Sequence, residues 1–240
     1  MAYPNLVMFD VDETLIDHEK SARLALEAVI NNIEEFSGIC YSELREIWAR
    51  DFQKYWKEVI FGKTTIEENR INRFESTLKE LGSSEPEATA LKAAEIYGHV
   101  YDSSISAIPG SHDFIMMIRE LEIPVALITN NLVENQKMKL EKSGFSNMYD
   151  FMITSEETGL FKPDGEMFNK ALERFGVSPE QALMIGNSFA EDVVGAFNAG
   201  VKAAWFNRSR FKPLQSDVEY LEIHDFQPVE ITLNTVISWF

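Results

Sequence analysis

The sequence has little cysteine, little positive charge and no long apolar run. Its 240 residues include one cysteine, Cys40, so an internal disulfide is excluded. There are 22 Lys and Arg residues against 39 Asp and Glu residues, which gives a formal net charge of −17. Nucleic acids are bound mainly through clusters of basic residues. We therefore expect no nucleic-acid partner.

The apolar runs are too short to cross a membrane. The longest lie at 124–128 and 231–240, whereas a transmembrane helix needs roughly 20 apolar residues. The N-terminal segment lacks the charged, apolar and small-residue regions that together mark a signal peptide. We therefore predict no membrane partner, a cytoplasmic location, and a monomer or homodimer.

Short apolar runs alternate with amphipathic stretches over much of the chain. The hydrophobic fraction of 45% is typical of a globular protein. Strand-like runs lie at 5–10, 124–128, 151–154, 182–185 and 203–206, and helix-like stretches lie at 111–121, 134–143, 165–175 and 189–199. Strands that alternate with helices indicate βαβ units. The predicted fold class is α/β, with a Rossmann-like, doubly wound parallel sheet as its core.

The interval 18–104 interrupts this alternation. It contains no strand-like run, is rich in Glu, Lys, Leu and Ala, and carries apolar residues at helical spacing. Pro109-Gly110 then provides a turn signal before the chain returns to the alternating pattern. We predict a core domain formed by residues 1–17 and 105–240, with an α-helical cap domain of about four helices at 18–104.

Polar residues follow each of the first four predicted strands. Asp10 and Asp12 follow the first, 129–131 the second, Lys162 the third and 186–192 the fourth. Ligands of open parallel sheets bind at the carboxyl ends of the strands, so these residues are candidates for one site. Asp10 has the chemistry of a nucleophile or metal ligand, and Asp12 that of a proton carrier.

The order of these residues resembles the haloacid dehalogenase (HAD) superfamily. The motifs Asp-x-Asp-x-Thr, Thr-Asn, Lys-Pro and Gly-(Asp/Asn)-Ser-x-x-x-Asp occur here in the family's order, and the helical insert lies where the family places its C1 cap. The segments 154–168 and 198–207 are similar to the branch that contains pyrimidine 5′-nucleotidases. Thus the resemblance covers nearly the whole predicted core domain.

The resemblance implies a Mg²⁺-dependent phosphatase acting on small phosphate monoesters. Asp10 would attack the phosphorus to form an aspartyl-phosphate, and Asp12 would protonate the leaving oxygen and then accept a proton from water. Mg²⁺ would be held by Asp10, the backbone carbonyl of Asp12, Asn187 and Asp192. The expected partner is a small phosphorylated metabolite, either a nucleoside 5′-monophosphate or a sugar phosphate.

The resemblance also assigns the residues that bind the phosphoryl group. Lys162 would screen Asp10 from the charge of the incoming phosphate. Thr129 and the backbone amides of Glu13 and Asn130 would hold the phosphoryl oxygens. Helix capping is the structural alternative for Thr129 and Asn130.

One residue departs from the family pattern. Asn187 stands where the fourth motif usually has Asp, so a metal site there loses one formal charge and should bind Mg²⁺ more weakly. A phospho-ligand-binding regulatory protein that has lost turnover is therefore one alternative. A haloacid dehalogenase is another, although Asp12 argues against it because a halide leaves without a proton.

Aromatic residues gather in the predicted cap domain. Among Trp48, Phe52, Tyr55 and Trp56 there are pairs three and four residues apart, which places several of them on one helix face. We expect them to form the core of the cap, since aromatic stripes at this spacing usually pack against another helix. Stacking on a nucleobase is the functional alternative.

Overall fold

The structure, a computed structural model, describes residues 3–50, 52–212 and 217–240. The chain forms two compact units. The core unit contains the residues up to Asp17 together with Ala107–Phe240, and the helical unit is His18–Ser106. Each unit is described separately below.

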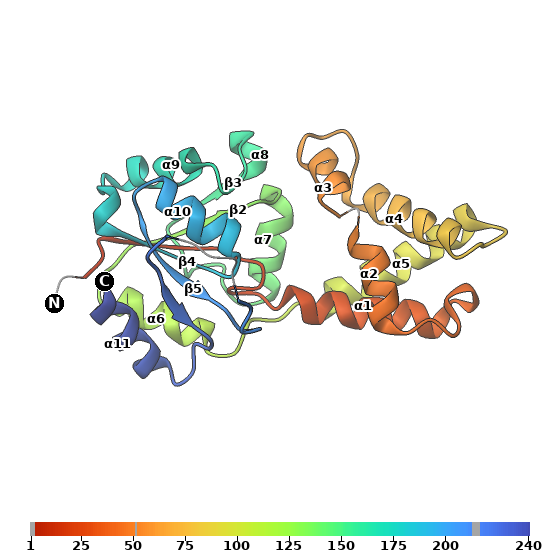
Figure 1. The fold of residues 1–240 in the computed structure, drawn as a ribbon, viewed down its shortest axis with the longest axis horizontal. Coiled ribbons are helices and arrows are strands. Elements are labelled where there is room, and N and C mark those ends of the chain that lie inside the picture. The colour runs from red at the N-terminus through yellow and green to blue at the C-terminus, as the bar shows by residue number, and fades with distance from the viewer. Residues whose placement is uncertain (1–2, 51, 213–216) are drawn as a thin grey trace. The chain divides into compact units, whose positions relative to one another are not determined.

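The core unit is built on a sheet of six parallel strands in the order β3-β2-β1-β4-β5-β6, of which β2, β3, β4 and β5 are labelled in Figure 1. Their bounds are β1 Leu6–Phe9, β2 Val125–Thr129, β3 Phe151–Thr154, β4 Ala182–Gly186, β5 Lys202–Phe206 and β6 Leu221–Ile223. The strand order reverses between β1 and β4. A reversal of this kind opens a crevice at the carboxyl ends of the two strands, which is where ligands of open α/β sheets bind.

Helices cover both faces of this sheet, with α9 and α10 on one face and α6 and α11 on the other (Figure 1). Their bounds are α6 Ser111–Glu120, α7 Val133–Lys142, α8 Ser155–Thr158, α9 Gly165–Phe175, α10 Val194–Asn198 and α11 Val229–Trp239. A 3₁₀ turn, η2, spans Pro179–Gln181, and a π-helical turn, η3, spans Phe189–Val193.

Both faces of the sheet are apolar because the side chains of a strand alternate between them. On β1, Met8 belongs to the cluster beneath α9 that includes Phe168. The next residue, Phe9, points the other way and meets the ring of Phe114 on α6 at a centroid distance of 6.3 Å. Burial on two faces explains why β1 is an unbroken apolar run.

The predicted fold class is confirmed, since the core is a doubly wound parallel sheet. The five predicted strands are present, but the prediction omitted β6. This strand has three residues and carries the charged Glu222 at its centre, so it gives no apolar run in the sequence. The stretch predicted as one helix at 189–199 instead begins as the π-helical turn η3 and continues as α10.

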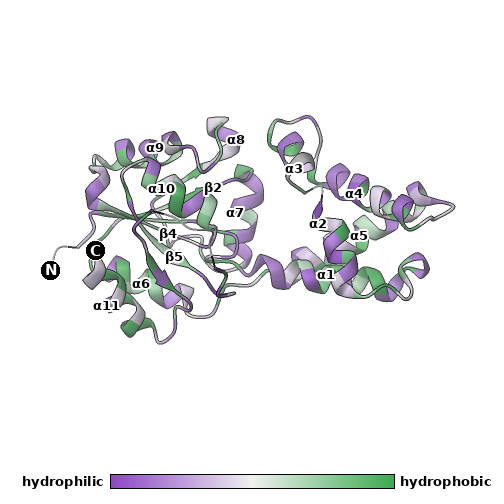
Figure 2. Cartoon of the chain, in the orientation of Figure 1, coloured by the Kyte–Doolittle hydropathy of each residue, from purple (hydrophilic) through white to green (hydrophobic). Residues whose placement is uncertain are grey.

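The helical unit contains five α-helices and one short turn among the described residues. They are α1 His18–Asn32, η1 Glu34–Phe36, α2 Tyr41–Arg50, α3 Phe52–Ile60, α4 Ile66–Glu80 and α5 Pro86–Ser104. A capping box starts α4, where the Thr65 side chain accepts from the Glu68 amide and the Glu68 side chain accepts from the Thr65 amide. Figure 2 shows hydrophilic and hydrophobic residues mixed along these helices, as expected for amphipathic helices. Within the described part of the chain, the helices are too short or too polar to span a bilayer.

The aromatic residues of the helical unit divide into a buried and a more exposed group. Trp48 is buried and packs against Phe74 and Tyr97, with ring centroids 4.2 and 5.1 Å away. Phe52 is exposed and stacks on Trp56. For Trp48 the core-packing interpretation is thus confirmed.

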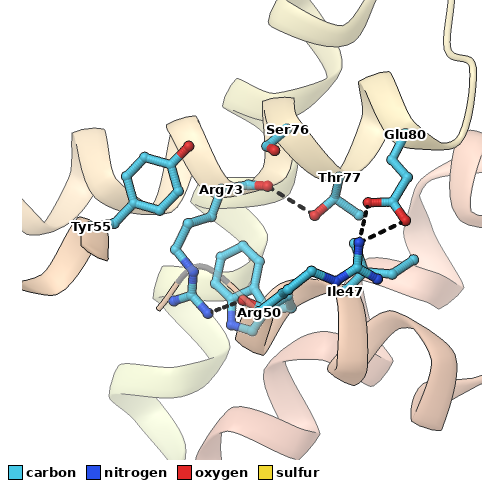
Figure 3. Close-up of a pocket in the computed structure, with 8 residues that line it drawn as sticks. Ile47, Arg50, Tyr55, Arg73, Ser76, Thr77 and Glu80 are labelled. Carbon is cyan, nitrogen blue, oxygen red and sulfur yellow. Dashed lines mark hydrogen bonds and ion pairs between the residues drawn. The ribbon is translucent and has the colours of Figure 1, made fainter. Parts of the chain in front are cut away.

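A small cavity next to this aromatic core is drawn in Figure 3. Its walls include Arg73, whose guanidinium lies 3.6 Å from the Trp48 ring centroid, and the ion pair between Arg50 and Glu80. The cavity volume is about 20 Å³, which is room for one water molecule. It is too small for a phosphorylated metabolite.

The chain leaves the core unit and returns to it through adjacent segments. Ile16 pairs with Ala107 in an antiparallel bridge. Just beyond, the Ile108 amide donates to the Leu15 carbonyl at 2.8 Å, and the Ser111 hydroxyl lies 3.3 Å from the same oxygen. The helical unit is therefore an insertion whose two ends are held together by the core.

Candidate active site

The carboxyl edge of the sheet brings together the polar residues that follow the central strands. Asp10 comes directly after β1, Thr129 ends β2, and Asn187 comes directly after β4. Because β1 lies between β2 and β4, these three positions are neighbours at the edge where the strand order reverses. Lys162 reaches the same place from the loop between α8 and α9.

A buried lysine links two carboxylates at the centre of this site. Lys162 Nζ donates to Asp10 Oδ1 at 2.7 Å and to Asp192 Oδ1 at 2.6 Å. The Lys162 and Asp192 side chains are each 1% exposed, and that of Asp10 is 10% exposed. A single buried cation therefore lies between two buried acids, which leaves an excess of negative charge.

Burial and the neighbouring charges shift the pKa values of all three groups. Burial raises the pKa of Asp10 to about 7, against the opposing charge of Lys162. Burial likewise raises the pKa of Asp192, again opposed by Lys162. For Lys162, burial acts to lower the pKa, but the two carboxylates outweigh it and raise the pKa above its ordinary value. The site would be stabilised by a further positive charge.

Gly186 makes room for the Asp192 side chain. A Cβ atom on Gly186 would lie 2.3 Å from Asp192 Oδ2 and 2.6 Å from Asp192 Cβ. The turn η3 folds Asp192 back towards β4, and Asp192 Oδ2 accepts a hydrogen bond from the Ser188 amide at 2.9 Å. Only glycine fits at the end of β4 while Asp192 contacts Lys162.

The Gly186→Ala variant should therefore be destabilised by about 1–3 kcal/mol, because the added methyl group must displace a buried carboxylate. Thermal unfolding measures this effect. Gly165→Ala is the matched control, because a Cβ there meets its nearest atoms at 3.5 Å, an ordinary contact. Equal melting temperatures for the two variants would contradict the close packing of Gly186 against Asp192.

The Thr14 hydroxyl links the residue that follows β1 to the residue that follows β4. This hydroxyl donates to Asp10 Oδ2 at 3.0 Å and accepts a hydrogen bond from the backbone N–H of Asn187 at 3.0 Å. The Asn187 side-chain oxygen lies 3.5 Å from the same hydroxyl. Both oxygens of Asp10 are thus held, one by Lys162 and one by Thr14, and the Thr14 hydroxyl lies near both the Asp10 carboxylate and Asn187 Oδ1.

Asp12 is held by side chains from α7 and the loop before it. Lys139 Nζ lies 2.8 Å from each Asp12 oxygen. Asn131 Nδ2 and Gln136 Nε2 donate to Asp12 Oδ2 at 3.1 and 3.3 Å. The sequence interpretation assigned no role to Lys139 or Gln136, because an isolated lysine and glutamine on a helix give no motif.

Thr129 and Asn130 are tied into the site by their side chains. Thr129 is buried and its hydroxyl accepts from Gln136 at 3.0 Å. Asn130 Oδ1 accepts from the Lys162 amide at 2.8 Å, and Asn130 Nδ2 donates to the Lys162 carbonyl and to Glu191. The Asn130 side chain therefore fixes the loop that carries Lys162, and helix capping is not its role here.

Glu13 lies in a tight turn after the first motif. Its φ angle is +64°, and its amide donates to the Ile16 carbonyl at 2.8 Å. The amide that the sequence assigned to phosphate binding is thus occupied within the turn in this structure. The Glu13 carboxylate lies 3.8 Å from the Arg208 guanidinium.

The oxygen donors at this edge suit a hard cation. Asp10, Asp192 and the Asn187 amide can supply side-chain oxygens, and Asp12 can supply its backbone carbonyl, which is the type of donor that Mg²⁺ prefers. Among the described residues, no three His, Cys, Asp or Glu side chains form a ready metal cluster. The fit rests instead on the mixed donor set and on the excess negative charge around Lys162.

The fold and this site define a hydrolase of the HAD type. Residues 4–200 match the model of the haloacid dehalogenase-like hydrolase family. The chain belongs to this family, as its four ordered motifs indicated. The predictions of the family and of a hydrolytic enzyme are confirmed.

Several similar proteins are phosphatases by name. The chain is 29% identical over 213 residues to a glyceraldehyde 3-phosphate phosphatase from Methanothermobacter thermautotrophicus, covering 89% of this chain and 90% of that protein. It is 28% identical over 210 residues to the pyrimidine 5′-nucleotidase YjjG from Escherichia coli, covering 84% and 85%. It also resembles the crystal structure of YfnB from Bacillus subtilis bound to magnesium, with a TM-score of 0.74, 26% identity, and coverage of 98% and 100%.

Proposed function

We propose that this protein is a Mg²⁺-dependent phosphatase that hydrolyses small phosphate monoesters through an aspartyl-phosphate on Asp10. The observation that carries the proposal is the buried Asp10–Lys162–Asp192 cluster at the carboxyl edge of the sheet, with a second carboxylate, Asp12, two residues after the first. The magnesium in YfnB and the phosphatase names of the relatives support it.

In the first step, an Asp10 oxygen attacks phosphorus and the bond from phosphorus to the ester oxygen breaks. Asp12 gives a proton to that leaving oxygen, so the product departs as an alcohol. Lys162 offsets the negative charge of Asp10 and of the approaching phosphate. The Thr129 hydroxyl and the amides of Glu13 and Asn130 are proposed to contact the phosphoryl oxygens, which requires the Glu13 amide to release the Ile16 carbonyl.

In the second step, water attacks the phosphorus of the aspartyl-phosphate and gives its proton to the Asp12 carboxylate. The bond from phosphorus to the Asp10 oxygen breaks, which restores the Asp10 carboxylate and frees inorganic phosphate. Asp10, Asp192, the Asn187 amide oxygen and the Asp12 carbonyl would hold Mg²⁺. Bound there, the metal supplies the positive charge that two acids and a phosphate dianion need.

The helical unit, residues 18–106, is proposed to act as the cap that selects the substrate. The named relatives act on a triose phosphate and on pyrimidine nucleotides. The substrates to test first are therefore nucleoside 5′-monophosphates and small sugar phosphates. Both classes present the same phosphate monoester to Asp10.

The test is phosphate release from a panel of these esters during a Mg²⁺ titration. Acid quenching during turnover, followed by peptide mass spectrometry, should locate a phosphoryl group on Asp10. Protection from unfolding by an ester, without phosphate release at any Mg²⁺ concentration, would instead show a phospho-ligand-binding protein. Release of chloride from chloroacetate would show a dehalogenase.

Asn187→Asp should lower the half-saturating Mg²⁺ concentration for phosphate release, by roughly tenfold, because it returns a full charge to the metal site. Asn187 Oδ1 lies 3.5 Å from the Thr14 hydroxyl, which also donates to Asp10, so the added carboxylate would face the same hydroxyl. The control is Asn234→Asp, which adds the same charge on an exposed position of α11. An unchanged Mg²⁺ requirement would count against Asn187 as a ligand.

A further inference from the structure

The acid–base residue Asp12 is supported by one helix of the core unit. Lys139 on α7 approaches both Asp12 oxygens at 2.8 Å. One turn earlier on the same helix, Gln136 donates to Asp12 Oδ2 at 3.3 Å. Asn131, in the loop before α7, donates to the same oxygen at 3.1 Å. Three donors from one segment thus converge on a single carboxylate.

The burial of Lys139 sets it apart from the other lysines of α7. The Lys139 side chain is 4% exposed, whereas Asp12 is 26% exposed. Lys137 is 55% exposed and pairs with the highly exposed Glu134. Burying a lysine costs free energy unless a charged partner repays it. Asp12 is that partner. The position of the Lys139 side chain therefore depends on the Asp12 carboxylate, and the position of the carboxylate depends on Lys139.

The proposed nucleophile Asp10 and the proposed acid–base residue Asp12 contact different buried lysines. Lys162 lies between Asp10 and Asp192, and Lys139 pairs with Asp12. The two lysines come from different segments, the loop after α8 and the helix α7. Lys139 can therefore be replaced while the cluster around the nucleophile is left intact.

Gln136 links this arrangement to the phosphate-binding side of the site. The same Nε2 atom that donates to Asp12 also donates to the Thr129 hydroxyl at 3.0 Å. Asn131 donates to Gln136 Oε1 at 3.0 Å. The side chain of Asp12 and the hydroxyl of Thr129 are thus held by one fully buried amide.

We propose that Lys139 is a positioning residue that, with Gln136 and Asn131, orients the Asp12 carboxylate for both of its proton transfers. This inference rests on the proposed phosphatase function. Proton transfer requires the donor and acceptor to lie within hydrogen-bond reach. Without the ion pair, Asp12 can turn towards solvent on its exposed side and lose that placement.

The two chemical steps differ in how much they need Asp12 when the leaving group is acidic. p-Nitrophenyl phosphate releases nitrophenolate, so the attack by Asp10 needs no proton from Asp12. Hydrolysis of the aspartyl-phosphate still requires Asp12 to take a proton from water. A protein with a misplaced Asp12 should therefore complete the first step and stall before the second.

The experiment compares Lys139→Met with the wild type in stopped-flow assays with Mg²⁺ and p-nitrophenyl phosphate. Methionine keeps the apolar stem of lysine and removes the charge. We expect a burst of about one nitrophenolate per protein at close to the wild-type rate, and then steady turnover slowed about 10²-fold. Lys139→Arg should restore turnover to within about tenfold of the wild type, because it keeps the charge next to Asp12.

Lys137→Met is the matched control and should leave both phases unchanged, since it removes an exposed lysine from the same helix. Gln136→Met provides a second variant with the ion pair intact; because Gln136 also holds the Thr129 hydroxyl, this variant should slow both the burst and the steady turnover, by about tenfold. In an Asp12→Asn background, Lys139→Met should have no further effect on the slow phase.

Two results would overturn the positioning role. One is turnover by Lys139→Met equal to that of the wild type. The other is an equal loss in the burst and in the steady phase of that variant, which indicates general damage to the fold. If the wild type releases neither nitrophenolate nor phosphate from any ester, the proposed function itself fails, and that outcome is distinct from a variant that merely matches an active wild type.

Discussion

Lys162→Met is expected to lower the free energy of unfolding by about 3–5 kcal/mol, because it removes the cation from a buried pair of acids. Asp10 and Asp192 both contact Lys162 Nζ, and Asp192 is almost fully buried. With the lysine gone, the two carboxylates keep their burial but lose their shared counter-charge. Urea unfolding measures the loss, and phosphate release should also fall sharply.

Two further variants test the cause of this instability. Lys170→Met removes an exposed lysine from α9 and should cost less than about 0.5 kcal/mol. Adding Asp192→Asn to Lys162→Met should recover part of the lost stability, because only one carboxylate then remains unpaired. If Lys162→Met unfolds at the same urea concentration as Lys170→Met, the buried charge cluster does not contribute to stability as described.

Asp10→Asn is expected to reduce phosphate release by a factor on the order of 10⁴ or more, as does the loss of a nucleophile in other enzymes. The amide has nearly the size of the carboxylate, and its single oxygen can still accept the hydrogen bond from Lys162, while its NH2 group replaces the oxygen that faces Thr14, so the fold should persist. Phosphate release from the best ester of the panel gives the rate, and thermal unfolding verifies the fold.

The control for this variant is Asp17→Asn, the same substitution outside the charge cluster. Asp17 pairs with Arg208 in the core unit. The Asp17→Asn variant should keep most of the phosphatase activity. A rate for Asp10→Asn within tenfold of the wild type would exclude Asp10 as the nucleophile, whatever the behaviour of Asp17→Asn.

The sequence was sufficient to predict the strand ends and the charged residues on them. β1, β2 and β4 are buried on both faces, so each is an apolar run that stops at a polar residue. That stop is a local signal, visible without knowledge of the fold. The parallel topology then brings the three ends together, which explains why Asp10, Thr129 and Asn187 could be assigned to one site.

The sequence was not sufficient to predict the support that α7 gives to Asp12. Gln136 and Lys139 are three residues apart, so they share a helix face, but a polar helix face normally points to solvent. Their burial depends on how α7 packs in the core unit, which is a tertiary property. The role of the Asn130 side chain was missed for the same reason, since its partners lie 32 and 61 residues away.

The sequence predicted the helices of the helical unit less precisely than the strands of the core unit, because this unit is packed from helices alone. About four helices were expected, and five α-helices occupy the described part of this unit. Apolar spacing identifies helices but does not place their ends. The burial of Trp48 followed from its spacing, whereas the exposure of Phe52 is set by which neighbours α3 meets.

The bridge between Ile16 and Ala107 makes the two units separable in evolution and in engineering. Because the core holds both ends of the insertion together, a different insertion of any length could begin and end at the same two points with a small cost in loop closure. Recombination at this junction would leave Lys162, Lys139 and their carboxylates untouched. The structure therefore allows the carboxylates and lysines of the core unit to be kept while the inserted helical unit is exchanged as a module.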